Sequence, residues 1–235
     1  MNPHPASIEI MEGIISQSNF IPWRGYFATL RRVRVLVLYD SQQFTRRDWR
    51  NRNIIRGKHG PEWLTVPVAT RGHYLAPINK IRISDSSFFP RANRIIRDRY
   101  KEFGKTEGFE FVSGLFDKAK EYQKLSDLNL FLTHEICQYL EIDIKIENDS
   151  SLQIDLDKNS KLIYLCKNFG ISSYYSGPTA KDYLDIHLFS QNDLQVSFFD
   201  FSKLVVPPQQ IELSIIHHLI VSPTAELNLL TRWSN

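Results

Sequence analysis

The 235-residue chain has few of the residues that mark specialised classes of protein. It contains two cysteines, Cys137 and Cys166, each within an apolar helical pattern and neither in a CxxC motif. We interpret them as buried, reduced thiols, which suit a cytosolic protein. No stretch approaches the roughly 20 apolar residues that a membrane span needs. The first residues also lack the basic and apolar regions of a signal peptide. We therefore expect a cytoplasmic protein without a membrane span.

Several catalytic signatures are also missing. The chain has no GxSxG, no Walker A motif and no GxGxxG. His134-Glu135 lacks the second histidine of HExxH, and the adjacent His217 and His218 would point about 100° apart on a helix. The segment 155–157 matches the short DxD pattern of metal-dependent glycosyltransferases, although we favour a solvated strand face there. The sequence therefore predicts no metal and no evident cofactor.

Charge is nearly balanced over the whole chain but unevenly distributed along it. The net charge is +3, with 42% hydrophobic and 23% charged residues, which is ordinary globular composition. Arginines crowd the first quarter, at positions 31, 32, 34, 46, 47, 50, 52 and 56. Acidic residues collect in the middle, at 135, 141, 143, 147, 149, 155 and 157. The basic segment indicates an anionic ligand, such as a phosphate or a carboxylate, that is bound locally.

The order of predicted elements favours an α/β fold. A short strand at 13–15, a polar loop, a helix over 22–32 and a β-branched strand over 33–38 give the βαβ pattern of a parallel sheet. A hairpin is predicted over 52–68, with its turn at 57–61. Further strands are predicted at 78–83, 142–147, 152–156, 173–175 and 196–201, and helices at 87–104, 109–119, 126–139, 160–170 and 176–189, with two more at the C-terminus.

This pattern predicts a mixed, partly parallel sheet with flanking helices and a Rossmann-like start. We expect a flexible N-terminus over 1–12 and a single domain over 13–235. The three helices between 87 and 139 are interpreted as core packing without a chemical role.

The loop that follows the first strand is rich in amide and hydroxyl groups. Parallel sheets bind ligands at the carboxyl ends of their strands, so this loop and Asp40 should share one rim. Gln17 and Asn19 offer donors and acceptors that suit a sugar, an amide or a carboxylate. Asp40 could take a proton from an amine or orient a ribose hydroxyl, or it could be a simple cap. Trp23 could stack on a ligand or fill the core.

A second candidate segment is TRRDWRNRN. Its guanidinium groups could hold the phosphates of a nucleotide diphosphate, and its aromatic ring could stack on the base. The residues concerned are Arg46, Arg47, Trp49, Arg50 and Arg52. The alternative is a solvated basic turn. If residues 51–55 form a strand, Asn51 and Asn53 would point away from the two neighbouring arginines, and only one of these sets could line the site.

A third candidate segment is Ser176-Gly177-Pro178, which precedes a predicted helix. Ser176 could cap that helix, and the free N–H groups beside Gly177 could bind an anion. Lys181, Asp182 and Tyr183 would lie in the first turns and could reach the same ligand. Capping alone is the alternative.

Three blocks of the chain resemble the WbqC-like protein family. They are QSNFIPWRGYF (17–27), LYDSQQFTRRDWRNRN (38–53) followed by WLTVPV (63–68), and YYSGPTAKDYLD (174–185). Gln43 is a candidate ligand contact because it lies in the second block. The family often has His-Gln-Pro where this chain has Ser16-Gln17-Ser18, so any histidine base of its relatives is absent here.

The resemblance implies a role in the synthesis of O-antigen and other bacterial surface polysaccharides. We expect transfer of an acyl or aminoacyl group, such as glycyl, to the amine of a nucleotide-linked amino sugar. Asp40 would accept the proton, and Gln17 or Asn19 would stabilise the oxyanion. The donor stays open between an acyl thioester, an aminoacyl-tRNA and an ATP-activated acid. The alternatives are a non-catalytic module that binds nucleotide sugars or RNA, and a glycosyltransferase.

Overall fold

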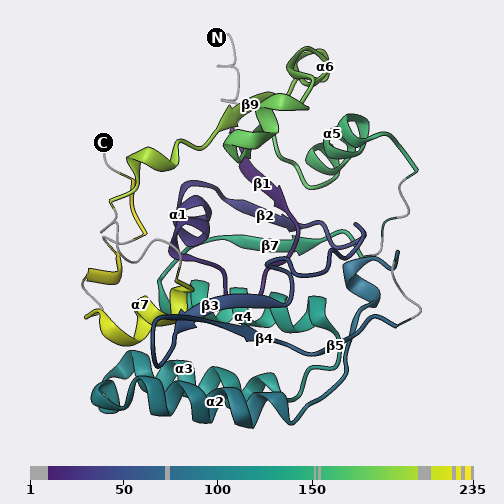
Figure 1. The fold of residues 1–235 in the computed structure, drawn as a ribbon. Helices are drawn as coiled ribbons and strands as arrows, with labels where there is room; N and C mark the ends of the chain where they lie inside the picture. Colours follow the sequence, from purple (N-terminus) through teal and green to yellow (C-terminus); the bar gives the residue numbers. More distant parts are fainter. Residues whose placement is uncertain are drawn as a thin grey trace, which may run out of the picture.

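The centre of the fold is a five-stranded sheet with the order β7-β2-β1-β8-β9 (Figure 1). This computed structural model describes residues 10–71, 75–150, 152, 155–205, 213–223, 226–228 and 231–233. The strands are β1 Glu12–Ser16, β2 Val35–Leu38, β7 Lys145–Asn148, β8 Ser173–Ser176 and β9 Gln195–Phe198. Every pairing in this sheet is parallel, which confirms the predicted α/β fold. Residues 1–9 of the predicted flexible N-terminus lie outside the described residues, and Glu12 already belongs to β1.

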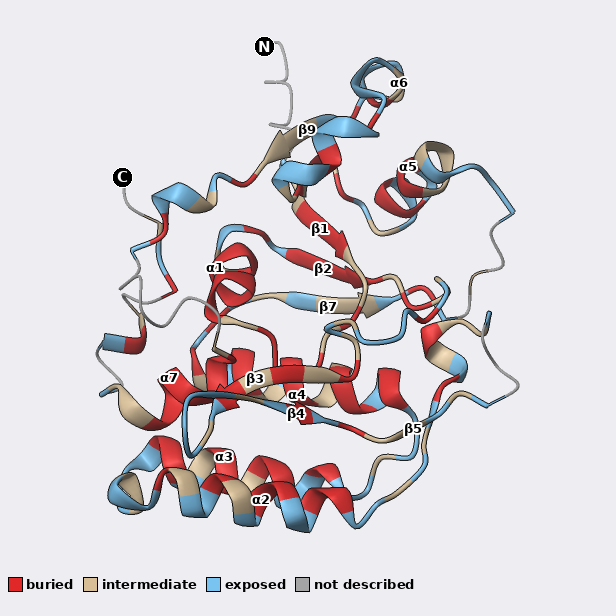
Figure 2. Ribbon diagram, viewed as in Figure 1, coloured by how far each residue is buried: buried red, intermediate tan, exposed pale blue. Residues whose placement is uncertain are grey.

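The sheet is buried on both faces, as its apolar strands require. Ile14 and Leu36 are register partners and face the larger core, which includes helix α1 (Arg24–Arg32). Ile15 and Val37 are also partners and face a second core under α5 (Lys158–Asn168) and α6 (Ile186–Ser190). Figure 2 shows β1 and β2 buried, whereas much of α6 is exposed.

Most of the remaining elements form a layer on the α1 side of the sheet (Figure 1), whereas η3 (Pro178–Asp182) packs with α5 and α6 through Ala180. A hairpin of β3 (Arg52–Arg56) and β4 (Pro61–Thr65) confirms the predicted hairpin, and a small ribbon joins β5 (Val68–Ala69) to β6 (Arg82–Ile83). Helices α2 (Phe88–Arg99), α3 (Glu107–Ala119), α4 (Leu125–Tyr139) and α7 (Ile215–Val221) complete the core. Short 3₁₀ turns are η1 Ile78–Lys80, η2 Lys101–Phe103, η3 Pro178–Asp182 and η4 Phe201–Lys203.

Several predicted boundaries were wrong. Helix α1 begins at Arg24 rather than at 22, and the strand expected over 78–83 is split into η1 and β6. The helix expected from 176 to 189 is replaced by η3 and α6, because Ser176 still pairs with Phe198 in the sheet. Of the strand expected over 152–156, residues 153 and 154 lie outside the described residues, and 152, 155 and 156 are not in a strand.

Local capping explains one residue of the DxD pattern. The Asp157 carboxylate accepts hydrogen bonds from the N–H groups of Asn159 and Ser160, and so caps α5. This contact accounts for Asp157 without a metal ion. At the C-terminus, residues 226–228 are helical, and the rest of the last predicted helix lies largely outside the described residues.

The two adjacent histidines of α7, His217 and His218, are both buried. The Nδ1 atom of His217 lies 3.2 Å from the Tyr100 hydroxyl. Burial, together with a smaller effect of the nearby Arg56, lowers the pKa of His217 from its ordinary value near 6.5 to about 4. The folded protein therefore holds a neutral histidine at pH values where the unfolded chain binds a proton.

This burial predicts a pH-dependent loss of stability. Between about pH 6.5 and 4 the unfolded state binds more protons, so the free energy of unfolding falls as the pH falls, by on the order of 2 kcal/mol from His217. We expect His217→Gln to reduce this slope in urea unfolding experiments across that range. His59→Gln, an exposed change on the hairpin turn, is the matched control and should leave the slope unchanged. An unaltered slope in His217→Gln would contradict the prediction.

Candidate functional site

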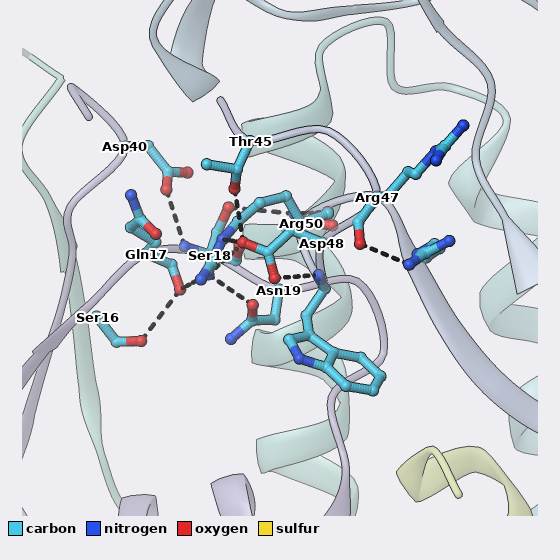
Figure 3. A network of polar contacts seen from close by, with 12 residues as sticks. Ser16, Gln17, Ser18, Asn19, Asp40, Thr45, Arg47, Asp48 and Arg50 are labelled. Carbon is cyan, nitrogen blue, oxygen red and sulfur yellow. Dashed lines mark hydrogen bonds and ion pairs between the residues drawn. The ribbon is translucent and has the colours of Figure 1, made fainter. Parts of the chain in front are cut away.

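Two buried carboxylates at the carboxyl edge of the sheet fix the loops after β1 and β2. Asp40 follows β2, and its Oδ1 accepts the backbone N–H of Ser18 at 2.8 Å (Figure 3). Asp149 follows β7 and accepts the N–H groups of Asp40 (2.9 Å) and Ser41 (3.1 Å). Burial raises the pKa of both carboxyl groups. The predicted rim is therefore present, but Asp40 is only 2% exposed and braces the loop.

Arg50 also holds the loop after β1. Its Nη1 donates to the backbone oxygens of Gln17 (3.1 Å) and Ser18 (3.2 Å) and to Asn19 Oδ1 at 2.6 Å (Figure 3). Its Nε lies 3.6 Å from the Asp48 carboxylate. Burial lowers the pKa of this guanidinium, and the carboxylate opposes that shift. Arg50 therefore fixes protein groups, and its charge is already balanced inside the fold.

Buried asparagines brace the surrounding backbone. Asn53 Nδ2 donates to the backbone oxygens of Phe20 (3.1 Å) and Ile21 (3.0 Å), where Ile21 has the left-handed φ of 38°. Asn129 Nδ2 donates to Ser18 Oγ (3.1 Å) and to the Arg50 backbone oxygen (2.9 Å). The interpretation of α4 as packing alone was therefore incomplete, because its residue Asn129 belongs to the site.

An aromatic cleft of about 560 Å³ opens beside this network. Its lining includes Asn19, Pro22, Trp23, Tyr26, Trp49 and Asn53. Asn19 uses its Oδ1 for Arg50, and its Nδ2 has no partner among the described residues. The Tyr26 hydroxyl is buried and unpartnered within the same part of the chain. Sequence reasoning missed Tyr26, although its position one helical turn after Trp23 is a usable signal.

A basic hollow of about 610 Å³ lies next to the cleft. Its lining includes Arg46, Arg47, Asn51 and Arg52. Arg46 donates to the Thr70 hydroxyl at 2.9 Å. Arg52 Nη2 donates to the Arg47 backbone oxygen at 2.5 Å. Three of the predicted arginines therefore share one surface.

A ridge of neighbouring side chains lies between the aromatic cleft and the basic hollow. The Arg52 guanidinium lies 3.9 Å from the centre of the Trp63 ring, which is 5.3 Å from the Trp49 ring. Both indoles are 44% exposed. We call these three side chains the Trp–Arg ridge. Trp49 faces the cleft and Arg52 faces the hollow, so one ligand could contact both.

The alternation expected if residues 51–55 formed a strand does not extend to Asn51. Asn51 and Arg52 were placed on opposite faces, yet both line the basic hollow. The reason is that β3 begins only at Arg52, so Asn51 does not follow the strand period. Arg50 turns inward and does not share a surface with Arg52.

The third sequence block lies elsewhere on the carboxyl edge. Ser176 ends β8, and its Oγ accepts the Tyr174 hydroxyl at 3.3 Å. Lys181 lies over the Phe198 ring, and the Tyr183 ring lies 3.1 Å from Lys158 Nζ. Gly177 and Asp182 bound η3 and belong to the same edge. None of these residues is among those that line the cleft or the basic hollow. Gln43, from the second sequence block, is also absent from both linings; it is exposed and forms a backbone bridge with Pro77.

The family model for the WbqC-like protein family matches residues 17–228. The chain belongs to this family. It is also similar to the uncharacterized protein Rv1507c of Mycobacterium tuberculosis, with 33% identity over 188 residues, which cover 80% of this chain and 81% of the relative. No solved structure matches the chain significantly. The resemblance seen in the three sequence blocks is thus confirmed.

The matched region of this WbqC-like protein contains the buried network, the cleft and the basic hollow. Cys137 and Cys166 are buried free thiols, and burial raises the pKa of both to about 12. Within the described ranges, no three His, Cys, Asp or Glu side chains are grouped so that they could hold a metal ion. The described helices include none with the length and apolar character needed to cross a membrane.

Proposed function

We propose that this WbqC-like protein is a cytoplasmic transferase of surface-polysaccharide (O-antigen) biosynthesis. It would move an acyl or aminoacyl group, such as glycyl, onto the amine of a nucleotide-linked amino sugar. The observation that carries this proposal is the Trp–Arg ridge, because it places exposed aromatic faces between a basic hollow and an amide-lined cleft. A nucleotide sugar combines the diphosphate, flat base and hydroxylated ring that such a surface suits.

The aromatic cleft and the basic hollow suggest how the nucleotide sugar would lie. The diphosphate would meet Arg46, Arg47 and Arg52 in the basic hollow, and the base would stack against the exposed indoles of the ridge. The amino sugar would enter the aromatic cleft beside Asn19 and Tyr26. In this arrangement Arg50 orders the loop instead of binding phosphate, since its Nη1 donates to three acceptors of the loop and its side chain is largely buried.

In the proposed reaction, the sugar amine attacks the carbonyl carbon of an activated acyl donor, a thioester or an aminoacyl ester. A C–N bond forms, the bond from carbon to the leaving sulfur or oxygen breaks, and the leaving group takes the proton that the amine loses. Asn19 Nδ2, which has no partner among the described residues, would stabilise the oxyanion, and the half-exposed Gln17 of the same loop is the second candidate for this role. Buried Asp40 would act by positioning Ser18, and direct proton transfer to it would require the loop to open.

A non-catalytic module that binds nucleotide sugars or RNA is the second candidate. The burial of Asp40 and the exposed pair of indoles favour it, since stacking platforms bind nucleotides without chemistry. Mass spectrometry of amino-sugar nucleotides incubated with thioester and aminoacyl-tRNA donors separates the candidates. A product heavier by one acyl group supports the transferase. A bound but unaltered nucleotide supports the module, and release of free nucleoside diphosphate supports a glycosyltransferase.

Removal of one ridge indole tests the binding surface itself. We expect Trp49→Ala to weaken nucleotide-sugar binding by about tenfold or more in calorimetric titrations, because a stacked base is worth roughly 1–3 kcal/mol. The fold should be little affected, since the Trp49 backbone oxygen, and not its ring, accepts the Phe20 N–H. Trp49→Phe keeps an aromatic face and should retain most of the affinity. Equal affinity in Trp49→Ala and the unaltered protein would exclude the ridge as the binding surface.

A further inference from the structure

A third hollow, of about 530 Å³, lies on the α1 side of the sheet beside β8 and β9. We call it the C-terminal hollow, because Trp233 and Arg232 line it. Helices α5 and α6 pack on the opposite face of these strands. On this side, aromatic side chains of the C-terminal part of the chain pack beside the strands. The hollow next to them has a volume that suits a small ligand.

The floor of the C-terminal hollow is aromatic and fixed in orientation. Phe199 and Trp233 are stacked, with ring centroids 5.4 Å apart and planes 14° from parallel. Tyr175 lies 5.3 Å from Phe199, and its hydroxyl donates to Glu12 Oε1 at 3.1 Å. The Trp233 Nε1 donates to the Ala28 backbone oxygen at 3.0 Å, which locks the indole. Such a floor favours a ligand with a flat conjugated ring.

The rim of this hollow is positively charged. Arg31, Arg32, Lys203 and Arg232 contribute cations, and Asp200 supplies the one carboxylate among the described residues of the lining. That carboxylate already accepts the N–H and hydroxyl of Ser202.

The hydrogen-bond acceptors of Arg31 among the described residues are all neutral groups. It donates to the Leu140 backbone oxygen (2.6 Å), to Asn228 Oδ1 (2.7 Å) and to Thr231 Oγ1 (3.0 Å). Among the described residues, no carboxylate forms an ion pair with Arg31, Arg32 or Arg232. The rim therefore carries positive charge that an anionic ligand can balance.

We propose that the C-terminal hollow is a second ligand site, and that it binds a nucleoside phosphate. The base stacks on the Phe199–Trp233 floor, and the phosphates meet Arg32 and Arg232. The site is distinct from the aromatic cleft, because Phe201 stands between Trp23 of the cleft (5.5 Å) and Trp233 (5.7 Å). It does not depend on the proposed transferase activity.

Calorimetric titration with adenosine and uridine diphosphates tests this site. The titrations use a Trp49→Ala/Arg52→Ala background, so that binding at the ridge is removed. In that background, Arg32→Glu/Arg232→Glu should weaken binding by at least tenfold. Both side chains are exposed, so the variant should fold. Arg94→Glu is the control, because it makes the same type of substitution at an exposed arginine of distant α2 (Figure 1). It should change the affinity less than twofold.

Crystals soaked with the same diphosphates should show a base against Trp233. Unchanged affinity in the double glutamate variant together with an unoccupied hollow would overturn the proposal. Inorganic pyrophosphate that binds as tightly as a nucleoside diphosphate would also overturn it, because the aromatic floor would then contribute nothing. Binding of a single-stranded oligonucleotide without binding of mononucleotides would reassign the hollow to nucleic acid. A negative result in these assays would not affect the test of acyl transfer, because that test measures the mass of a product formed at the aromatic cleft.

Discussion

Gly108→Ala is expected to destabilise the protein by about 3 kcal/mol or more, whereas Gly114→Ala in the same helix should stabilise it by about 0.5–1 kcal/mol. A Cβ at Gly108 would lie 1.7 Å from the Leu219 backbone oxygen and 2.7 Å from its carbonyl carbon. These atoms belong to α7, so no flexible side chain can move aside and the two helices would have to separate. A Cβ added at Gly114 would meet no atom of another described segment within 4 Å, so alanine there only improves helix propensity.

The effect of Gly108→Ala should reach the aromatic cleft. Just before α7, Ser214 donates through its hydroxyl to the Ile21 backbone oxygen (2.6 Å) and through its N–H to the Ile54 oxygen (2.7 Å). The N–H of Ile215 donates to the Pro22 oxygen at 2.9 Å. A displaced α7 therefore moves the wall of the cleft. Urea unfolding and ligand titration of both variants provide the check, and equal stability of the two alanine variants would contradict the packing described.

The local sequence pattern was sufficient to predict the first two strands of the sheet and the helix between them. The strand, polar loop, helix and strand between 13 and 38 specify β1, α1 and β2, and a parallel pair must end on one rim. For this reason the shared rim of the loop and Asp40 could be predicted, although the particular hydrogen bond from Ser18 to Asp40 was not. The position of β8 beside β1 did not follow, because its partner lies about 160 residues away. For the same reason Ser176 was expected just before a helix, whereas it pairs with Phe198 in the sheet.

The candidate site was predicted by residue type but not by role. The sequence gathers arginines in one segment, yet it cannot show that Arg50 points to Gln17 and Ser18 while Arg52 lies over Trp63. Two bracing residues, Asn129 and Asp149, were missed because each acts on backbone groups about 80–110 residues away in the chain. The C-terminal hollow was missed because three separated segments supply its floor.

Arg50→Ala should be the most damaging change in the candidate site. The substitution removes the donor shared by the backbone oxygens of Gln17 and Ser18 and by Asn19 Oδ1, and it leaves Asp48 without its cation. Buried acceptors left without a donor cost about 1–3 kcal/mol each, and a broken buried ion pair costs about 3–5 kcal/mol. Since these contributions overlap and Asp48 is partly exposed, we expect a total loss of about 3–5 kcal/mol in the free energy of unfolding.

Two further variants separate the effect of the planar guanidinium donors of Arg50 from the effect of its charge. Arg50→Lys keeps the charge but loses the planar set of donors, so its stability should fall between those of the alanine variant and the unaltered protein. Arg94→Ala removes an exposed arginine from α2 and should have no measurable effect. If Arg50 positions the loop, Arg50→Lys should also weaken nucleotide-sugar binding, because Asn19 at the cleft depends on the same guanidinium. A lysine variant with full affinity would show that the loop holds its shape through Asp40 and Asn129 alone, and that Arg50 stabilises the fold without setting the site.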